Sequence, residues 1–188
     1  MKYREMAGEK ISVLGFGCMR FPTTSKNAED IDAEKSAKML EYAIENGVNY
    51  FDTAYVYHGG KSESFIGGVL KPYRDKIHIA TKCPTWEVKC EEDFDRLLNE
   101  QLERLQTDYI DFYLVHALDK DRFKKVVEKF NLIDKLNKAK ADGKIRHIGF
   151  SFHDDVETLK KIIDANPNWE FCQIQLNYIN VKYQAGLE

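Results

Sequence analysis

The chain has 188 residues, of which 43% are hydrophobic and 31% charged, and its formal net charge is -3 at pH 7. This balance allows a buried core but offers no basic surface for nucleic acid and no apolar run long enough to cross a membrane, so we expect neither partner. Its four cysteines lack metal-ligand or disulfide spacing, which predicts reduced thiols, no metal site and a cytoplasmic location.

The first part of the chain alternates between strand and helix patterns. Residues 3–6 and 11–17 read as strands around a turn at Gly8, which predicts a short β-hairpin. A helix is expected over 33–46, with Gly47 as its left-handed cap, and a strand over 48–51. After Tyr57, His58-Gly59-Gly60 reads as a flexible turn rather than a pocket wall, and Ser62 as the hydroxyl cap of a short helix.

The rest of the chain continues the alternation. Strands are predicted over 77–81, 109–115, 146–150 and 171–176, and helices over 91–105, 123–141 and 155–165. The run His153-Asp154-Asp155 looks like a metal cluster at first sight. We interpret it as a helix start, because acidic side chains favour the positive end of the helix dipole.

Strand centres that recur about every 30 residues are typical of βαβ units and a parallel sheet. A doubly wound sheet is the rival, but Gly15-Phe16-Gly17-Cys18 does not lead into a helix as its phosphate loop would. The prediction is therefore an α/β (β/α)8 TIM barrel with about six βα units after the N-terminal hairpin. We expect residues 1–188 to form one partial barrel domain of a longer chain; a complete, open six-stranded domain is the alternative.

Four side chains that could together form one catalytic site lie near the ends of successive predicted strands. They are Asp52, Tyr57, Lys82 and His116. In a barrel these ends converge on the face that carries catalysis. A lysine ammonium beside a tyrosine stabilises the phenolate, a carboxylate holds the lysine, and a histidine can donate to a substrate oxygen. Each residue alone is more often a packing or surface residue, so the prediction rests on the set.

The chain resembles the aldo-keto reductase family from residue 11 to about residue 178. The resemblance is carried by residues 14–17, 49–57, 61–63, 81–82, 105–116, 143–151 and 172–175. It implies that Asp52, Tyr57, Lys82 and His116 are the catalytic tetrad, with Tyr57 as general acid in the NADP(H)-dependent reduction of a small aldehyde or ketone. It also implies that Ser151 and Gln173 hold the nicotinamide; the asparagine expected beside Ser151 is replaced by Phe152.

The resemblance leaves several readings open. The run 149–153 is similar to that of longer family members with a C-terminal iron–sulfur extension, so such a cluster is expected only in a longer parent chain. A non-catalytic nicotinamide-binding protein of the same fold is one alternative function, and an inactive barrel fragment is another. Six strands cannot close an eight-stranded barrel, which predicts self-association through the open edges, where Ile174 and Leu176 would be exposed.

Overall fold

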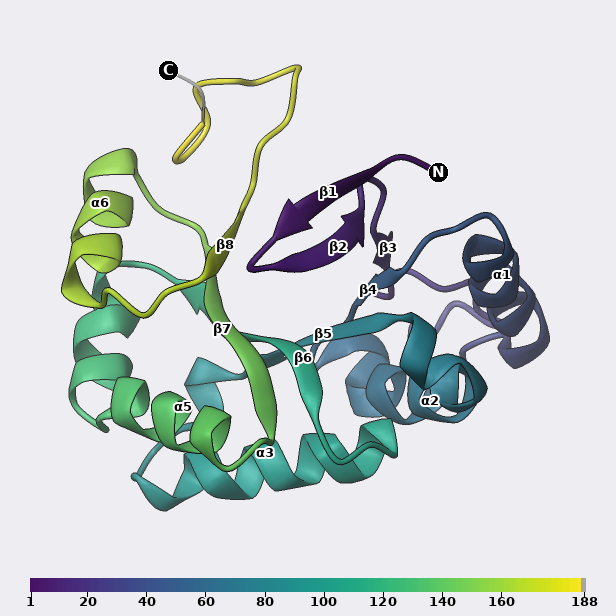
Figure 1. Cartoon of the computed structure of the whole chain (residues 1–188), viewed down its shortest axis with the longest axis horizontal. Coiled ribbons are helices and arrows are strands. Elements are labelled where there is room, and N and C mark those ends of the chain that lie inside the picture. The colour runs from purple at the N-terminus through teal and green to yellow at the C-terminus, as the bar shows by residue number, and fades with distance from the viewer. Residues whose placement is uncertain (187–188) are drawn as a thin grey trace.

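A computed structural model describes residues 1–186, in which a curved parallel sheet is surrounded by helices (Figure 1). The antiparallel hairpin comes first, with β1 (Tyr3–Met6) and β2 (Glu9–Ser12). The sheet then contains, in spatial order, β3 (Phe16–Gly17), β4 (Tyr50–Asp52), β5 (His78–Cys83), β6 (Ile110–Leu118), β7 (Ile145–Phe152) and β8 (Phe171–Ile174).

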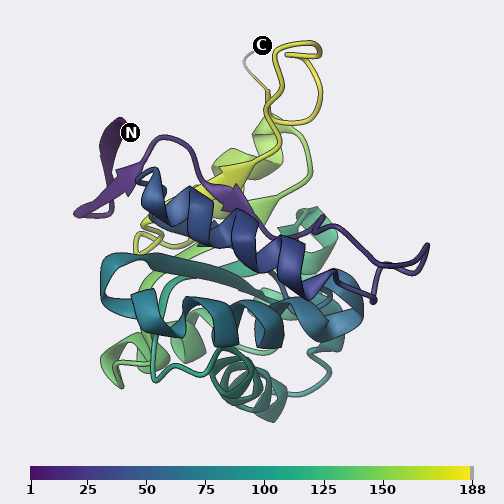
Figure 2. The ribbon, with the colours of Figure 1, turned by 90° about the vertical axis from the view of Figure 1, so that its right-hand side faces the viewer.

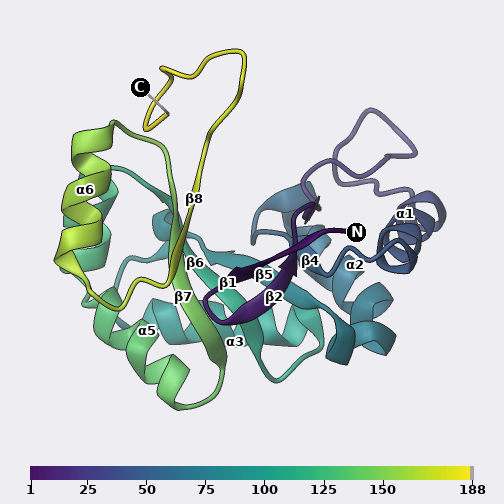
Figure 3. The same ribbon diagram turned by 45° about the horizontal axis from the view of Figure 1, so that its top comes forward.

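Each strand from β4 to β8 pairs in parallel with the strand before it in the chain. A doubly wound sheet reverses its strand order at one point, and the described strands show no such reversal. The sheet is strongly curved (Figures 1 and 3). The predicted parallel α/β sheet, wound in one direction as in a barrel and preceded by a hairpin, is confirmed.

The helices lie on the outer side of the sheet (Figure 2). They are α1 (Ala33–Glu45), α2 (Lys61–Leu70), α3 (Glu92–Leu105), α4 (Lys120–Arg122), α5 (Leu132–Ala141) and α6 (Val156–Ala165). Shorter helical turns span Tyr57–Gly60, Lys71–Lys76, Thr85–Glu87 and Phe123–Glu128. Helix α6 starts as expected, because the Asp155 side chain accepts a hydrogen bond from the Thr158 amide. Gly47 has the predicted left-handed φ of +85°.

Hydrophobic side chains pack on both sides of the sheet because neighbours along a strand point in opposite directions. On β6, Tyr113 and Val115 belong to the large cluster shared with the helices, whereas Phe112 and Leu114 belong to a smaller cluster. Ile11 of the hairpin joins that smaller cluster, and the hairpin lies across the concave side of the sheet (Figure 3). The hairpin thus covers part of the sheet's interior.

The strand predicted over residues 11–17 is wrong as one element. The chain leaves β2 after Ser12 and enters β3 only at Phe16. Ser12 and Asn49 cause the break, because the Ser12 amide donates to Asn49 Oδ1 at 2.7 Å and the Asn49 amide donates to Ser12 Oγ at 3.1 Å. These bonds tie the end of the hairpin to the start of β4 and redirect the chain.

Two helix predictions also need correction. The helix predicted over 123–141 is interrupted at Asn131, which has a left-handed φ of 53° that asparagine tolerates, and α5 begins at Leu132. Ser62 does not cap α2, which follows a left-handed Gly60. The Ser62 hydroxyl is buried and bonds to the Cys18 carbonyl and the Thr53 hydroxyl, so a tertiary contact takes the place of the local cap.

The sheet ends in two open edges, β3 and β8. Ile174, the last residue of β8, is 36% exposed, and Leu176, two residues beyond the end of this strand, is 48% exposed, so both are exposed as expected. Self-association through these edges stays a prediction. Within residues 1–186, no helix has the length and apolar character needed to cross a membrane.

Candidate active site

Asp52 and Lys82 form the centre of the candidate site. Asp52 ends β4 and pairs in register with Ala80, so Lys82 projects from β5 just beyond it. Lys82 Nζ donates to both Asp52 carboxylate oxygens at 2.8 Å and to the Thr53 carbonyl at 2.7 Å. The lysine side chain is 2% exposed and the aspartate side chain 14% exposed. The ammonium is therefore fixed by three acceptors and nearly removed from water.

Tyr57 lies beside this pair, on the turn that follows β4. Its amide donates to the Ala54 carbonyl at 3.1 Å, which closes the turn. Lys82 Nζ lies 3.5 Å from the Tyr57 hydroxyl and 5.1 Å from the centre of its ring. The lysine is thus within hydrogen-bond reach of the phenol, at the upper limit of the range.

His116 faces the same space from β6. Its ring centre is 6.4 Å from that of Tyr57 and 5.0 Å from that of Trp86. Burial lowers the pKa of His116 to about 3, and the nearby cations Lys82 and Arg122 add to the effect. Near pH 7 the imidazole is therefore neutral, and it can donate a hydrogen bond without giving up a proton.

The charge of Asp52 depends on two opposing effects. Burial raises the pKa of this carboxyl, while the positive charge of Lys82 and hydrogen bonds from Lys82 and Gln173 oppose the rise. The pKa stays above its ordinary value. The carboxylate thus relies on its two partners to remain ionised in a dry place.

Ser151 and Gln173 are register partners on β7 and β8. Both line a cavity of about 770 Å³ that also contains Tyr57, Lys82 and His116. The Ser151 hydroxyl accepts from the Ala117 amide at 2.7 Å and keeps its own hydrogen for donation. A hydroxyl and an amide side by side suit the carboxamide of a nicotinamide. Phe152 is buried in the core, with its ring centre 6.3 Å from that of Phe150, so it offers this cavity no polar group.

Several further residues line the cavity that the sequence analysis did not single out. They include Met19, Arg20, Val56, Trp86 and Gln175. Met19, Arg20 and Trp86 all lie a few residues beyond the end of a strand, which is the signal that could have identified them.

His58 was predicted in a flexible turn, and this is wrong. It is buried, and its Nε2 accepts from the Phe21 amide at 3.1 Å while Nδ1 bonds to the Ala28 carbonyl.

Tyr57, Lys82 and His116 therefore line one cavity, and Asp52 joins them through its contact with Lys82, although the four residues span positions 52 to 116. Among residues 1–186 no group of three or more histidine, cysteine or acidic side chains is placed to hold a metal ion. The arrangement offers a phenol, a buried ammonium and a neutral imidazole around a space for a small molecule. Such a set can polarise a carbonyl and deliver a proton to its oxygen.

The family model described as "Aldo/keto reductase family" matches residues 13–187. This match confirms the resemblance that the sequence motifs predicted. A probable aldo-keto reductase 1 of Glycine max is 32% identical over 153 residues, which are 77% of this chain and 42% of that protein. The chain thus spans less than half the length of this relative.

Solved structures agree with this assignment. A thermostable aldo-keto reductase, Tm1743, solved with the inhibitor epalrestat, has 29% identity and a TM-score of 0.75 over 93% of this chain and 62% of that one. An aldo/keto reductase from Klebsiella pneumoniae, in complex with NADP and acetate, has 25% identity and a TM-score of 0.70 over 90% of this chain and 55% of that one. The six-stranded sheet is thus similar to part of their barrel.

Proposed function

Because the chain belongs to the aldo/keto reductase family, we propose that the protein carrying it reduces small aldehydes or ketones to alcohols with NADP(H). The observation that supports this proposal best is the contact of one buried ammonium with both a carboxylate and a phenol. Lys82 Nζ lies 2.8 Å from Asp52 and 3.5 Å from the Tyr57 hydroxyl at the cavity. A similar structure of a family member holds NADP.

In the proposed reaction Tyr57 is the general acid. Its hydroxyl gives a proton to the carbonyl oxygen as that oxygen gains negative charge, and the phenolate left behind is stabilised by Lys82. Two unit charges about 4 Å apart attract by about 4 kcal/mol at an effective dielectric near 20, so the ammonium matters for this step. Asp52 keeps Lys82 charged and aimed at the phenol.

His116 has a different role in this scheme. Its lowered pKa, about 3 because of burial and nearby cations, leaves it neutral at physiological pH. A neutral imidazole donates a hydrogen bond to the carbonyl oxygen but does not compete with Tyr57 as the acid. The proposal therefore assigns orientation of the substrate to His116 and proton transfer to Tyr57.

Ser151 and Gln173 would hold the nicotinamide, which supplies the hydride when bound. Their neighbouring positions on β7 and β8 fit its carboxamide, and both face the tetrad cavity. Gln173 also lowers the pKa of Asp52, so the cofactor-binding residues are coupled to the catalytic ones. An iron–sulfur cluster is proposed only for a longer parent chain and not for residues 1–188. A cytoplasmic location, predicted from the cysteine pattern, belongs to the proposal as well.

The test is the Tyr57→Phe variant. General acid catalysis contributes about 10²–10⁴-fold, so kcat for a small aromatic aldehyde should fall by about that factor, while NADPH binding followed by fluorescence should survive. The matched control is Tyr42→Phe, because Tyr42 is 68% exposed on α1 and should not affect the rate.

The assay must follow the chemical step, so the rate is compared with NADPH and with its deuterated form. A Tyr57→Phe enzyme with unchanged kcat and a clear isotope effect would reject Tyr57 as the acid. NADPH binding without turnover of any aldehyde, ketone or quinone would favour the non-catalytic binding protein instead.

A further inference from the structure

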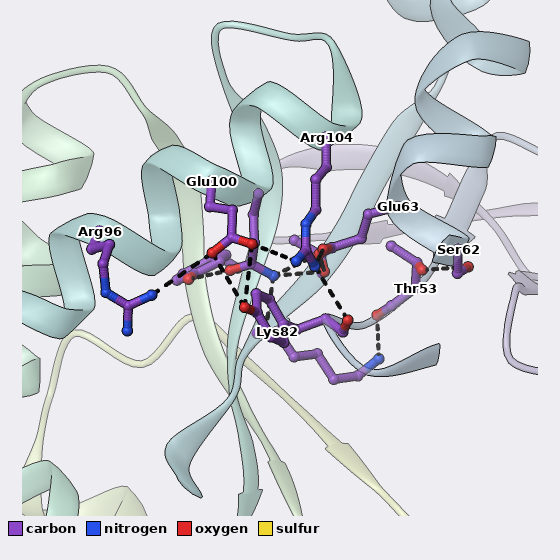
Figure 4. A network of polar contacts seen from close by, with 11 residues as sticks. Thr53, Ser62, Glu63, Lys82, Arg96, Glu100 and Arg104 are labelled. Atoms are coloured by element: carbon purple, nitrogen blue, oxygen red, sulfur yellow. Dashed lines mark hydrogen bonds and ion pairs between the residues drawn. The ribbon is translucent and has the colours of Figure 1, made fainter. Parts of the chain in front are cut away.

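Behind the candidate site, on the helix side of the sheet, lies a buried carboxylate that the proposed reaction does not use. Glu63 of α2 is completely buried. Its Oε1 accepts from the Thr81 hydroxyl and from Gln101 Nε2, each at 2.6 Å, and its Oε2 accepts from Arg104 Nη1 at 3.2 Å. Figure 4 shows Glu63 beside Arg104 in this network, with Glu100 and Lys82 nearby. The carboxylate is the centre of a polar network inside the core.

One branch of this network reaches Lys82 through the main chain. Gln101 Nε2, held by Glu63, also donates to the Lys82 carbonyl at 3.1 Å. Thr81, which bonds to Glu63, is the residue just before Lys82. Successive strand residues point to opposite faces, so Thr81 faces the helices while Lys82 faces the cavity. Glu63 thus fixes the backbone at the point from which the lysine projects.

A second branch reaches the turn that carries Tyr57. Arg104 Nη1 donates to the Tyr55 carbonyl at 3.4 Å, and its guanidinium lies 4.2 Å from the centre of the Tyr55 ring. The Tyr55 hydroxyl in turn donates to Glu100, which is paired with Arg104. Tyr55 is two residues before Tyr57. The same carboxylate therefore ties down both the strand of the lysine and the turn of the tyrosine.

This double attachment matters because the contact between Lys82 and Tyr57 is marginal. At 3.5 Å it stands at the limit of hydrogen bonding, so a shift of a few tenths of an ångström would break it. A buried ion network is a poor way to gain stability, since an apolar replacement of similar volume is often as good. Holding Lys82 and Tyr57 at the right distance would give such a network a role other than stability.

We propose that Glu63 is a positioning residue that sets the distance between Lys82 and Tyr57, an inference that rests on the function proposed above. Glu63 touches neither substrate nor cofactor and acts through Thr81, Gln101 and Arg104. A misplacement of about 1 Å far from the chemistry can cost about 10²-fold in rate. Loss of Glu63 should therefore lower kcat while leaving the affinity for substrate nearly unchanged.

The experiment compares Glu63→Gln with Asp111→Asn. Asp111 is also a fully buried acid with arginine partners, Arg74 at 2.7 Å and Arg146 at 3.1 Å, but it lies near the amino end of β6, away from the cavity. We expect Glu63→Gln to lower kcat by about 10- to 100-fold with KM changed less than about 3-fold. In the pH–rate profile of Glu63→Gln, the pH at which the rate falls on the basic side should also shift. Asp111→Asn should lower the unfolding midpoint and leave kcat and the pH profile as they are.

Two further variants separate the possible failures. Arg104→Lys keeps a cation but loses the contact with the Tyr55 carbonyl, and it should show a smaller loss of kcat even if Glu63→Gln does not fold. Tyr57→Phe tests the proposed function itself: full activity in this variant would reject the assigned mechanism. If Tyr57→Phe loses its activity while Glu63→Gln and Arg104→Lys keep the wild-type kcat and pH profile, the function stands and the positioning role of Glu63 is overturned.

Discussion

Replacing Lys82 by methionine should destabilise the fold strongly, and the loss should depend on pH. In the native chain the ammonium is 2% exposed and contacts Asp52, Thr53 and Tyr57. Methionine has a similar length and fills the space, so no large cavity forms. Asp52, whose side chain is only 14% exposed, is left without its cation. Breaking a buried pair in this way costs about 3–5 kcal/mol.

The pH dependence follows from the pKa of Asp52. Burial already raises it in the native chain against the effect of Lys82, so removal of the lysine raises it further. A carboxyl whose pKa is higher in the folded than in the unfolded chain takes up a proton on folding as the pH falls. Stability is therefore regained toward low pH, by at most about 1.4 kcal/mol per pH unit.

Urea unfolding of the wild type and of Lys82→Met at about pH 8 and pH 5.5 measures both effects. The difference in unfolding free energy should be about 3–5 kcal/mol at the higher pH and clearly smaller at the lower one. The double variant Asp52→Asn/Lys82→Met should be more stable than Lys82→Met at high pH, because no charge is left buried. A loss below about 1 kcal/mol, or the same loss at both values of pH, would refute the reasoning.

Two other predictions concern packing and association. Gly67→Ala should lower the unfolding free energy by about 1–3 kcal/mol, because its new Cβ would lie 2.5 Å from the Arg104 carbonyl oxygen. Gly68→Ala, whose Cβ would meet its nearest atom at 3.7 Å, should instead raise it by up to about 1 kcal/mol; equal effects in urea unfolding would contradict this packing argument. A second copy of the chain should pair with the open β8 edge, so the mass from light scattering should rise with concentration, and less so in Ile174→Lys. A constant monomer mass would show that the edges do not associate.

The strands and the tetrad could be predicted from the sequence because their signals are local. A buried strand appears as an apolar run, and the polar residues at its end mark the catalytic face of a barrel. Asp52, Lys82 and His116 each lie near such an end, and in the structure Lys82 and His116 line one cavity with Tyr57 while Asp52 contacts Lys82. The strands pair in chain order, so residues at the ends of successive strands lie close together in space.

Three of the errors have the opposite cause, since each of them depends on a contact between residues far apart in the chain. Ser62 looks like a helix cap, but Cys18, 44 residues away, takes its hydroxyl. The strand predicted over 11–17 breaks because Ser12 bonds to Asn49, 37 residues away. His58 looks like part of a loose turn and is instead held by the main chain at Phe21. No local pattern contains these partners.

The two fully buried acids among residues 1–186, Asp111 and Glu63, show how the fold separates stability from the proposed chemistry. Burial opposes ionisation of Asp111, but His78 and Arg74 outweigh it and lower its pKa, so its charge stabilises the fold and that stability is lost as acid protonates it. Burial of Glu63 is not outweighed by Thr81, Gln101 and Arg104, and its pKa stays raised.

An ionised Glu63 is therefore a cost to stability near neutral pH, whereas an ionised Asp111 is a gain. Asp111 lies at the amino ends of the strands, and Glu63 bonds to Thr81 beside Lys82, where the cavity opens. In barrel enzymes the amino ends serve stability and the carboxyl ends serve catalysis. Glu63, the acid whose ionisation lowers stability, is the one next to the candidate site. This is where a residue that positions catalytic groups is expected.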